Sequence, residues 1–192
     1  MAQTNVGISD IAVHIPSSRI DLETIVDYRV KADPEFERRI RRAVEKTSQL
    51  SIRFPQPWED SVTLATQAAY ALLRDRSPED LARMRYIGVG TETTVDQSKP
   101  IAAYVEGALQ RSGVPIPDTL STFQVQHACA GGTVAMLGIG SLLAMSPERN
   151  ESGLVVTTDV SRYAAPSTAE ITQGAGAVSL LVESNPKLVS LD

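Results

Sequence analysis

The stretch Thr122-Phe123-Gln124-Val125-Gln126-His127-Ala128-Cys129-Ala130-Gly131-Gly132-Thr133 joins two different sequence patterns. Its first five residues include β-branched and aromatic side chains, which is typical of a strand. Beyond the stretch, Val134 to Met145 is a run of small and apolar residues, for which we expect a helix. Cys129, the only cysteine of the chain, therefore lies between the end of a strand and the start of a helix.

This position favours a reactive thiol at Cys129. A helix start presents unpaired backbone N–H groups and the positive end of the helix dipole, and both stabilise a thiolate. The same N–H groups can bind a developing oxyanion. The alternative is a buried cysteine that only fills space, the usual role of an isolated one. The pair Gly131-Gly132 favours the reactive interpretation, because residues without side chains let a substrate approach the sulfur closely.

The composition indicates an ordinary soluble globular protein of one domain. The 192 residues are 42% hydrophobic and 21% charged, which suffices for one sizeable core. The net charge of −5 and the pI of about 5.1 exclude the overall basic character of most nucleic-acid-binding domains. One basic run, Arg38-Arg39-Ile40-Arg41-Arg42, reads as the solvated face of a helix. An interface, or a site for the phosphates of a nucleotide-bearing substrate, is the alternative.

Several classes of protein and of site are not indicated. A single cysteine excludes an internal disulfide, and two histidines with one cysteine make no plausible metal-ligand set. The first residues lack the basic and apolar segments of an export signal, and no run approaches about 18 apolar residues. We therefore expect a cytoplasmic protein without a membrane span.

Strand patterns alternate with helix patterns along the chain, which predicts an α/β structure whose sheet is covered on both faces. Residues 49–58 contain two prolines and are predicted to be a loop. The predicted strands span residues 6–13, 86–90, 122–126, 153–158 and 175–182, with the start of another near 187–192. The predicted helices span residues 20–28, 60–74, 101–111 and 134–145, with further helix starts at Asp33-Pro34 and Ser77-Pro78.

A second functional candidate, Glu92, follows the strand that ends at Gly90. Ligands of open α/β sheets bind beyond the carboxyl ends of strands, where both Glu92 and Cys129 are expected. A thiolate and a carboxylate at one edge of a sheet can serve as nucleophile and as general acid or base. The alternatives are a helix-capping or surface carboxylate for Glu92 and the N-cap of the next helix for Asp96. We also expect His127 to share a strand face with Cys129 as a packed, hydrogen-bonded histidine.

Four motifs occur in the order in which one enzyme family has them. They are Gly90-Thr91-Glu92 with Asp96 and Ser98-Lys99, Ala128-Cys129-Ala130-Gly131-Gly132-Thr133, Thr158-Asp159-Val160-Ser161-Arg162-Tyr163, and Thr172-Gln173-Gly174-Ala175-Gly176-Ala177-Val178. On these motifs, most of the chain resembles the N-terminal half of the 3-hydroxy-3-methylglutaryl-CoA synthases, within the thiolase and ketoacyl-synthase superfamily. The cysteine and Gly-Ala-Gly-Ala motifs are shared with ketoacyl synthase III, whereas Glu92 is the discriminating residue.

The resemblance implies an acyl condensation that needs no cofactor besides coenzyme A thioesters as substrates. Cys129 would take an acetyl group from acetyl-CoA, and Glu92 would remove a proton from the acetyl methyl group. The carbanion equivalent would add to acetoacetyl-CoA, or to a β-keto acyl chain on an acyl carrier protein, before hydrolysis. The two acceptors correspond to the mevalonate route and to polyketide β-branching, and the sequence does not separate them.

The resemblance also implies roles for five further residues. Asp96 and Asp159 match acidic positions that support the site, and Tyr163 and Thr172 match positions that line the acyl pocket. Asp33 matches a position near the bound CoA. The alternatives to this family are a ketoacyl synthase III-like enzyme, which Glu92 disfavours, and a catalytically silent half-domain that serves as a partner in a synthase complex.

The resemblance further implies that residues 1–192 form one αβα half of a five-layered αβαβα thiolase-like fold with a mixed sheet. The Cys129 helix would lie buried at the centre, and a homodimer would pair through residues 119–126. The family's essential histidine and asparagine belong to the second half, and neither His14 nor His127 matches them. We therefore expect a fragment, a proteolytic product or one member of a split pair, inactive without a C-terminal half or a second polypeptide.

Overall fold

A six-stranded mixed sheet forms the centre of the computed structural model, which describes residues 5–191. The strand order is β5-β4-β6-β7-β1-β8. The strands of this sheet are β1 (Val6–His14), β4 (Met84–Thr91), β5 (Ser121–Gln126), β6 (Ser152–Ser161), β7 (Gly174–Ser184) and β8 (Val189–Ser190). The predicted strands are confirmed, and β6 and β7 extend beyond their predicted ends.

The strand directions bring three strand ends to one edge of the sheet. β4 pairs in parallel with both β5 and β6, whereas β7 runs antiparallel to β6 and to β1. In register, Thr91 of β4 lies beside Gln126 of β5, and Gly90 lies beside Thr157 of β6. The segments that follow β4 and β5 therefore leave the same edge, as the sequence predicts for Glu92 and Cys129.

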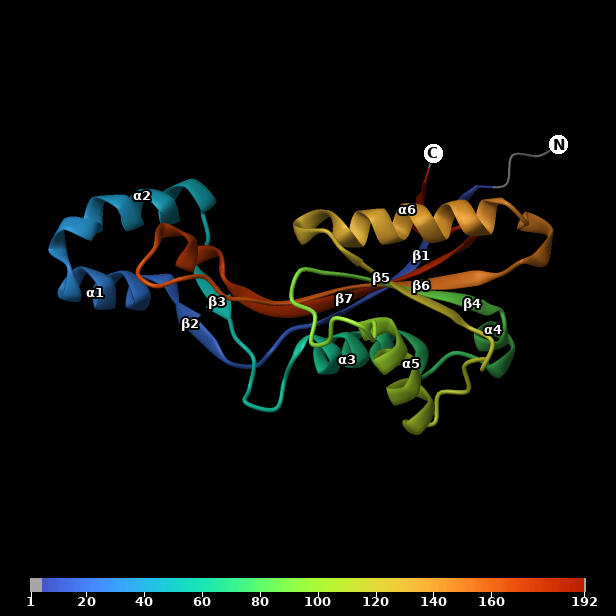
Figure 1. Cartoon of the computed structure of the whole chain (residues 1–192). Helices are drawn as coiled ribbons and strands as arrows, with labels where there is room; N and C mark the ends of the chain where they lie inside the picture. Colours follow the sequence, from blue (N-terminus) through green and yellow to red (C-terminus); the bar gives the residue numbers. More distant parts are fainter. Residues whose placement is uncertain (1–4, 192) are drawn as a thin grey trace.

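Helices cover both faces of this sheet (Figure 1), with α6 (Gly131–Ala144) on one face and α3 (Ser61–Leu73) and α5 (Ile101–Arg111) on the other. The helix on the first face packs with Ala135, Ile139 and Leu143 in the core. A larger apolar cluster fills the space under the opposite helices. The helices of these layers are α3 (Ser61–Leu73), α4 (Pro78–Ala82), α5 (Ile101–Arg111) and α6 (Gly131–Ala144), with the 3-10 turn η3 (Pro147–Arg149).

Local capping chemistry explains where two of these helices begin. Asp60 accepts a hydrogen bond from the backbone N of Thr63 at 2.7 Å, and Thr63 Oγ1 accepts one from the backbone N of Asp60. This capping box begins α3. Ser77 caps α4 by accepting a hydrogen bond from the backbone N of Asp80 at 3.1 Å, with Pro78 in the first turn. Both starts confirm the predictions.

The helix after Cys129 starts earlier than predicted, because α6 begins at Gly131, three residues before Val134. One face of the helix is exposed in the described chain, where Val134 is 41% and Leu137 is 55% exposed. Both side chains lie away from the core face, which Ala135 and Ile139 occupy. The prediction of a buried helix concerns the complete five-layered fold and stays a prediction.

A smaller unit lies beyond one end of the large sheet (Figure 1). Its own apolar cluster includes Leu22, Phe36, Ile40 and Ile171. It comprises β2 (Arg19–Asp21), β3 (Ser51–Arg53), α1 (Leu22–Ala32), η1 (Pro34–Phe36), α2 (Glu37–Thr47) and η4 (Thr168–Thr172).

The strand β3 corrects the prediction of a loop over residues 49–58. β3 pairs with β2, and Ile52 packs into the apolar cluster of the small unit. The prolines at 55 and 57 follow this strand rather than interrupt it.

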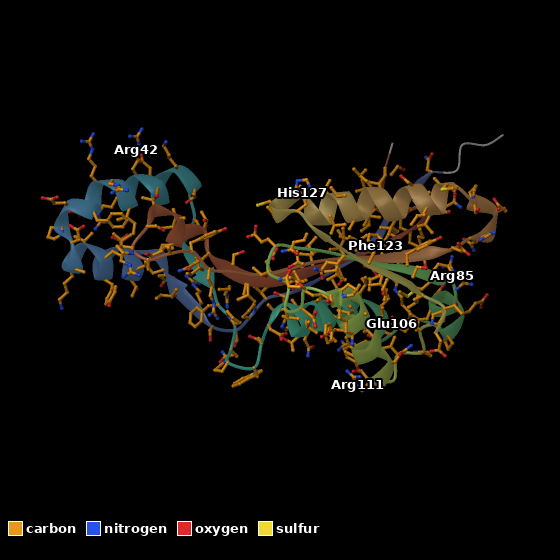
Figure 2. The ribbon with its side chains drawn as sticks, in the orientation of Figure 1. Arg42, Arg85, Glu106, Arg111, Phe123 and His127 are labelled. Atoms are coloured by element: carbon orange, nitrogen blue, oxygen red, sulfur yellow. The ribbon has the colours of Figure 1, made fainter. Side chains whose placement is uncertain are left out.

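The basic helix α2 has the solvated face that its sequence predicts. Arg41 bonds to Glu23 and Glu37, and Arg42 points away from the rest of the molecule (Figure 2). Among the described residues, none of the helices is long and apolar enough to cross a membrane.

Candidate active site

Cys129 lies in a short 3-10 turn, η2 (Ala128–Ala130), between β5 and α6. Cys129 is exposed. A hydrogen bond closes the turn, in which the backbone N of Ala130 donates to the carbonyl of His127 at 2.9 Å. Ala128 has a φ of 38°, in the left-handed region that residues with a side chain rarely adopt. This tight turn directs the chain from the strand into the helix and presents Cys129 at its start.

The turn also corrects the prediction for His127. β5 ends at Gln126, so His127 and Cys129 do not share a strand face. His127 is exposed at the end of α6 that carries Cys129 (Figure 2) and is not a packed core histidine. The positive φ at Ala128 turns the chain before strand geometry can continue.

The end of β4 touches the start of α6. A Cβ atom added to Gly90 would meet the backbone N of Gly132 at 2.1 Å and the backbone C of Gly131 at 2.3 Å. A Cβ atom on Gly132 would in turn meet Cγ2 of Thr157 at 2.1 Å. Only glycine permits such close backbone approach, and this contact brings the loop that carries Glu92 next to the turn that carries Cys129.

Glu92 is half-buried and is held at two points by β6. Its backbone N donates to Oδ1 of Asp159 at 2.8 Å. Its Oε1 accepts a hydrogen bond from Oγ of Ser161 at 3.0 Å. The carboxylate is thereby oriented without a cationic partner among the ion pairs of the described residues.

Asp159 organises the loop after β4. Besides the backbone N of Glu92, its Oδ1 lies within hydrogen-bond distance of Thr91 Oγ1 at 3.0 Å and of Thr93 Oγ1 at 2.8 Å. Ser61 at the start of α3 donates to the carbonyl of Thr93 at 2.8 Å. The sequence did not indicate Ser61 and Thr93 as site residues, because their partners lie more than 30 residues away in the chain.

Asp96 shapes the loop ahead of α5 but does not cap that helix. Its Oδ1 accepts hydrogen bonds from the backbone N atoms of Ser98 at 2.7 Å and Lys99 at 3.0 Å, and its Oδ2 accepts one from Tyr104 at 3.2 Å. These donors, the backbone N of Ser98 above all, lower the pKa of the Asp96 carboxyl. The N-cap of α5 is Pro100, so the prediction of an Asp96 N-cap is wrong.

The remaining predicted site residues lie in different places. Thr172 lines a hollow of about 340 Å³ together with Asp159 and Ser161. Tyr163 is 42% exposed, and its backbone N lies 3.5 Å from Oε1 of Gln173. Asp33 is exposed in the small unit, where it accepts a hydrogen bond from the backbone N of Glu35 and caps η1. The structure thus brings Thr172, but neither Tyr163 nor Asp33, to the hollow beside Asp159.

A larger cavity of about 530 Å³ lies between the small unit and the ends of β6 and β7. The Arg29–Glu170 ion pair, at 2.9 Å, forms part of its wall, and Glu170 is only 2% exposed. Ser161 borders both this cavity and the smaller hollow. The sequence did not indicate this cavity, because its walls come from residues 141 positions apart. Within residues 5–191, no cluster of three His, Cys, Asp or Glu side chains could hold a metal ion.

Comparison with known proteins assigns the fold and the family. Residues 2–187 match the family described as hydroxymethylglutaryl-coenzyme A synthase N terminal. A hydroxymethylglutaryl-CoA synthase of Enterococcus faecalis is 30% identical over 97% of this chain and 44% of its own length. The polyketide biosynthesis 3-hydroxy-3-methylglutaryl-ACP synthase PksG of Bacillus subtilis is 25% identical over 97% of this chain and 44% of its own length.

Two solved structures have the same fold. MvaS in complex with 3-hydroxy-3-methylglutaryl coenzyme A superposes with a TM-score of 0.81 at 34% identity, over 98% of this chain and 42% of that one. The curacin pathway HMG synthase in complex with holo donor-ACP gives a TM-score of 0.80 at 25% identity, over 98% and 43%. The chain therefore spans less than half the length of these proteins. It belongs to the hydroxymethylglutaryl-CoA synthase family and matches the N-terminal part of its members.

Proposed function

We propose that this chain supplies the nucleophile and the general base of an acyl-condensing enzyme of the hydroxymethylglutaryl-CoA synthase type. The Cys129 thiolate attacks the carbonyl of acetyl-CoA, and the CoA thiolate leaves. The Glu92 carboxylate takes a proton from the acetyl methyl group, and the resulting carbanion equivalent adds to the ketone of the acceptor. Water then hydrolyses the thioester and releases Cys129.

The observation that supports this assignment most is the contact between Gly90 and the start of α6. It places the loop of Glu92 beside the turn of Cys129, with no room for a side chain between the two backbones. The N-terminus of the 14-residue helix α6 adds a positive partial charge beside the sulfur. Asp96 and Asp159 support the site by ordering the loop on either side of Glu92.

The acceptor is acetoacetyl-CoA or a β-keto acyl chain on an acyl carrier protein. Both are supported by relatives, since one solved relative holds 3-hydroxy-3-methylglutaryl coenzyme A and PksG is named as a 3-hydroxy-3-methylglutaryl-ACP synthase. Thr172 and Tyr163 line the acyl pocket in this proposal, and Asp33 contacts CoA. No further cofactor is required.

A second half is needed to complete the site in this proposed function. The relatives are more than twice as long as the matched part, and the exposed outer face of α6 is apolar at Val134 and Leu137. We propose that a C-terminal half or a second polypeptide covers this face and supplies the remaining catalytic groups. The assembled protein works as a cytoplasmic homodimer, with β5 at the edge of the sheet as the pairing strand.

The chain is tested with labelled acetyl-CoA and either acetoacetyl-CoA or an acetoacetylated carrier protein, alone and with the C-terminal half of the Enterococcus faecalis relative. Mass spectrometry should find a 3-hydroxy-3-methylglutaryl product only when both halves are present. Glu92→Gln should lower its rate at least about 100-fold. Dependence on malonyl-CoA would instead indicate a ketoacyl synthase III-like enzyme. A wild-type chain that forms no product and no acetyl-enzyme in either mixture would indicate a silent partner domain.

A further inference from the structure

The side chain of Glu92 has one hydrogen-bond partner among the described side chains, and this partner is a neutral hydroxyl. Ser161 Oγ lies 3.0 Å from Glu92 Oε1. Both residues are half-buried, and 69 positions of sequence separate them. Ser161 is the last residue of β6, so a strand of the central sheet carries the donor.

We propose that Ser161 is a positioning residue for Glu92: its hydroxyl holds Oε1 of the carboxylate and leaves Oε2 to face the substrate. This inference rests on the proposed function, in which Glu92 is the general base. Ser161 itself touches no reacting atom in this account and acts only through Glu92.

The geometry around Glu92 supports a two-point attachment. Asp159 Oδ1 holds the backbone N of Glu92 at 2.8 Å, and Ser161 Oγ holds the side chain. Asp159 and Ser161 are two residues apart on one strand, so their side chains project from the same face of the sheet. The backbone and the side chain of Glu92 are both anchored to this strand, so the carboxylate has few accessible rotamers. Proton abstraction requires a base that is held in one orientation.

The hydroxyl of Ser161 is the side-chain contact that fixes the rotamer of Glu92. It donates to Oε1 at 3.0 Å. Losing this donor leaves the carboxylate free to rotate, although the backbone N of Glu92 stays bonded to Asp159.

Ser161 also lies where it can affect ligand contacts on two sides. It borders the hollow that Thr172 lines and the larger cavity that Arg29 lines. A hydroxyl that only filled space between the two cavities would not affect the environment of the Glu92 carboxyl group. A spectroscopic signal from that carboxyl group therefore separates a positioning role from a purely structural one.

The test is the carbon-13 NMR signal of the Glu92 carboxyl group in the 192-residue chain at a single neutral pH, with Glu92→Gln used to assign the signal. Wild type is compared with Ser161→Ala and Ser161→Thr. The matched control is Ser179→Ala, which removes a serine hydroxyl from β7 that has no hydrogen-bond partner in the described part of the chain. Should Ser161→Ala fail to fold, Ser161→Cys, with a weaker donor, takes its place.

We expect Ser161→Ala to shift the carbon-13 signal of the Glu92 carboxyl group, because the hydrogen bond to Oε1 is lost. Ser161→Thr should restore the wild-type signal, because it keeps the hydroxyl, and Ser179→Ala should leave the signal unchanged. Carboxyl signals of Ser161→Ala and wild type that superpose would overturn the proposal. The measurement needs no turnover, so its outcome is independent of the proposed function. That function is judged separately by acetylation of Cys129, which Ser161→Ala should leave intact.

Discussion

Asp159 Oδ1 lies 2.8 Å from the backbone N of Glu92, so the last residues of β6 hold the first residue after β4. The same oxygen lies 3.1 Å from the backbone N of Thr93. The position of the proposed base thus depends on one carboxylate that is 67 residues away in the chain.

Removing the Asp159 carboxylate should destabilise the fold. Asp159→Ala leaves the backbone N atoms of Glu92 and Thr93 without their acceptor, and hydrogen bonds to a charged group contribute about 1.5–3 kcal/mol each. We expect a loss of about 2–3 kcal/mol in the free energy of unfolding, measured by urea denaturation. Asp159→Asn keeps the Oδ1 acceptor and should lose less. Equal losses in the two variants would contradict this account of the loop.

Adding a methyl group at Gly90 should separate β4 from α6. The new Cβ would lie 2.1 Å from the backbone N of Gly132, and a backbone cannot move aside as a flexible side chain does. We expect Gly90→Ala to destabilise the fold by about 3 kcal/mol. The control is Gly107→Ala in α5, where the nearest atom is 3.6 Å away. That variant should gain about 0.5–1 kcal/mol, and a neutral Gly90→Ala would refute the close contact.

Arg29 and Glu170 should stabilise the small unit only when both side chains are present. Glu170 is 2% exposed, so removing Arg29 leaves a buried carboxylate without its cation. We expect Arg29→Met to lower the free energy of unfolding by about 2–3 kcal/mol, measured by urea denaturation. This loss is smaller than for a fully buried pair, because Arg29 is itself partly exposed. The double variant Arg29→Met with Glu170→Gln should recover most of this loss. A double variant as unstable as the single one would show that the ion pair is not the cause.

The contribution of Asp96 should depend on pH. The folded state lowers the pKa of its carboxyl, mainly through the backbone N of Ser98, so the stabilising contribution is present above the unfolded pKa of about 3.9. It is lost as the pH falls through the folded-state value. We expect Asp96→Asn to be less stable than wild type above about pH 5 and to approach it near pH 3. Tyr104→Phe, which removes one donor, should show a smaller difference of the same sign. A pH-independent difference would exclude the titration of Asp96 as its cause.

The local part of the fold could be predicted from the sequence. Asp60, Ser77 and Asp33 are each followed within three residues by the backbone N that they cap, so their helix starts depend on neighbours in the chain. Regular strands also follow from runs of β-branched residues, as in β4 and β6. The order of strands and helices along the chain is enough to predict that Glu92 and Cys129 lie at the same edge of the sheet.

The other features depend on contacts between distant residues. β3 was missed because its partner β2 lies about 30 residues earlier, and only that pairing makes Ser51–Arg53 a strand. The orientation of His127 was not predicted, because an alanine in the sequence does not indicate the positive φ that Ala128 adopts. The hydrogen bond from Ser161 to Glu92 likewise needs the register of β4 on β6. Periodicity and capping patterns carry no information about such pairs.

The most direct test of the central claim is the intact mass of the chain after incubation with acetyl-CoA. We expect the wild-type chain to gain about 42 Da, one acetyl group in place of a hydrogen, and Cys129→Ser to gain nothing. Glu92→Gln should still be acetylated, because the base acts after the thioester has formed. If folded wild-type chain gains no acetyl group, alone or with a C-terminal half, or if Cys129→Ser is acetylated equally, Cys129 is not the nucleophile.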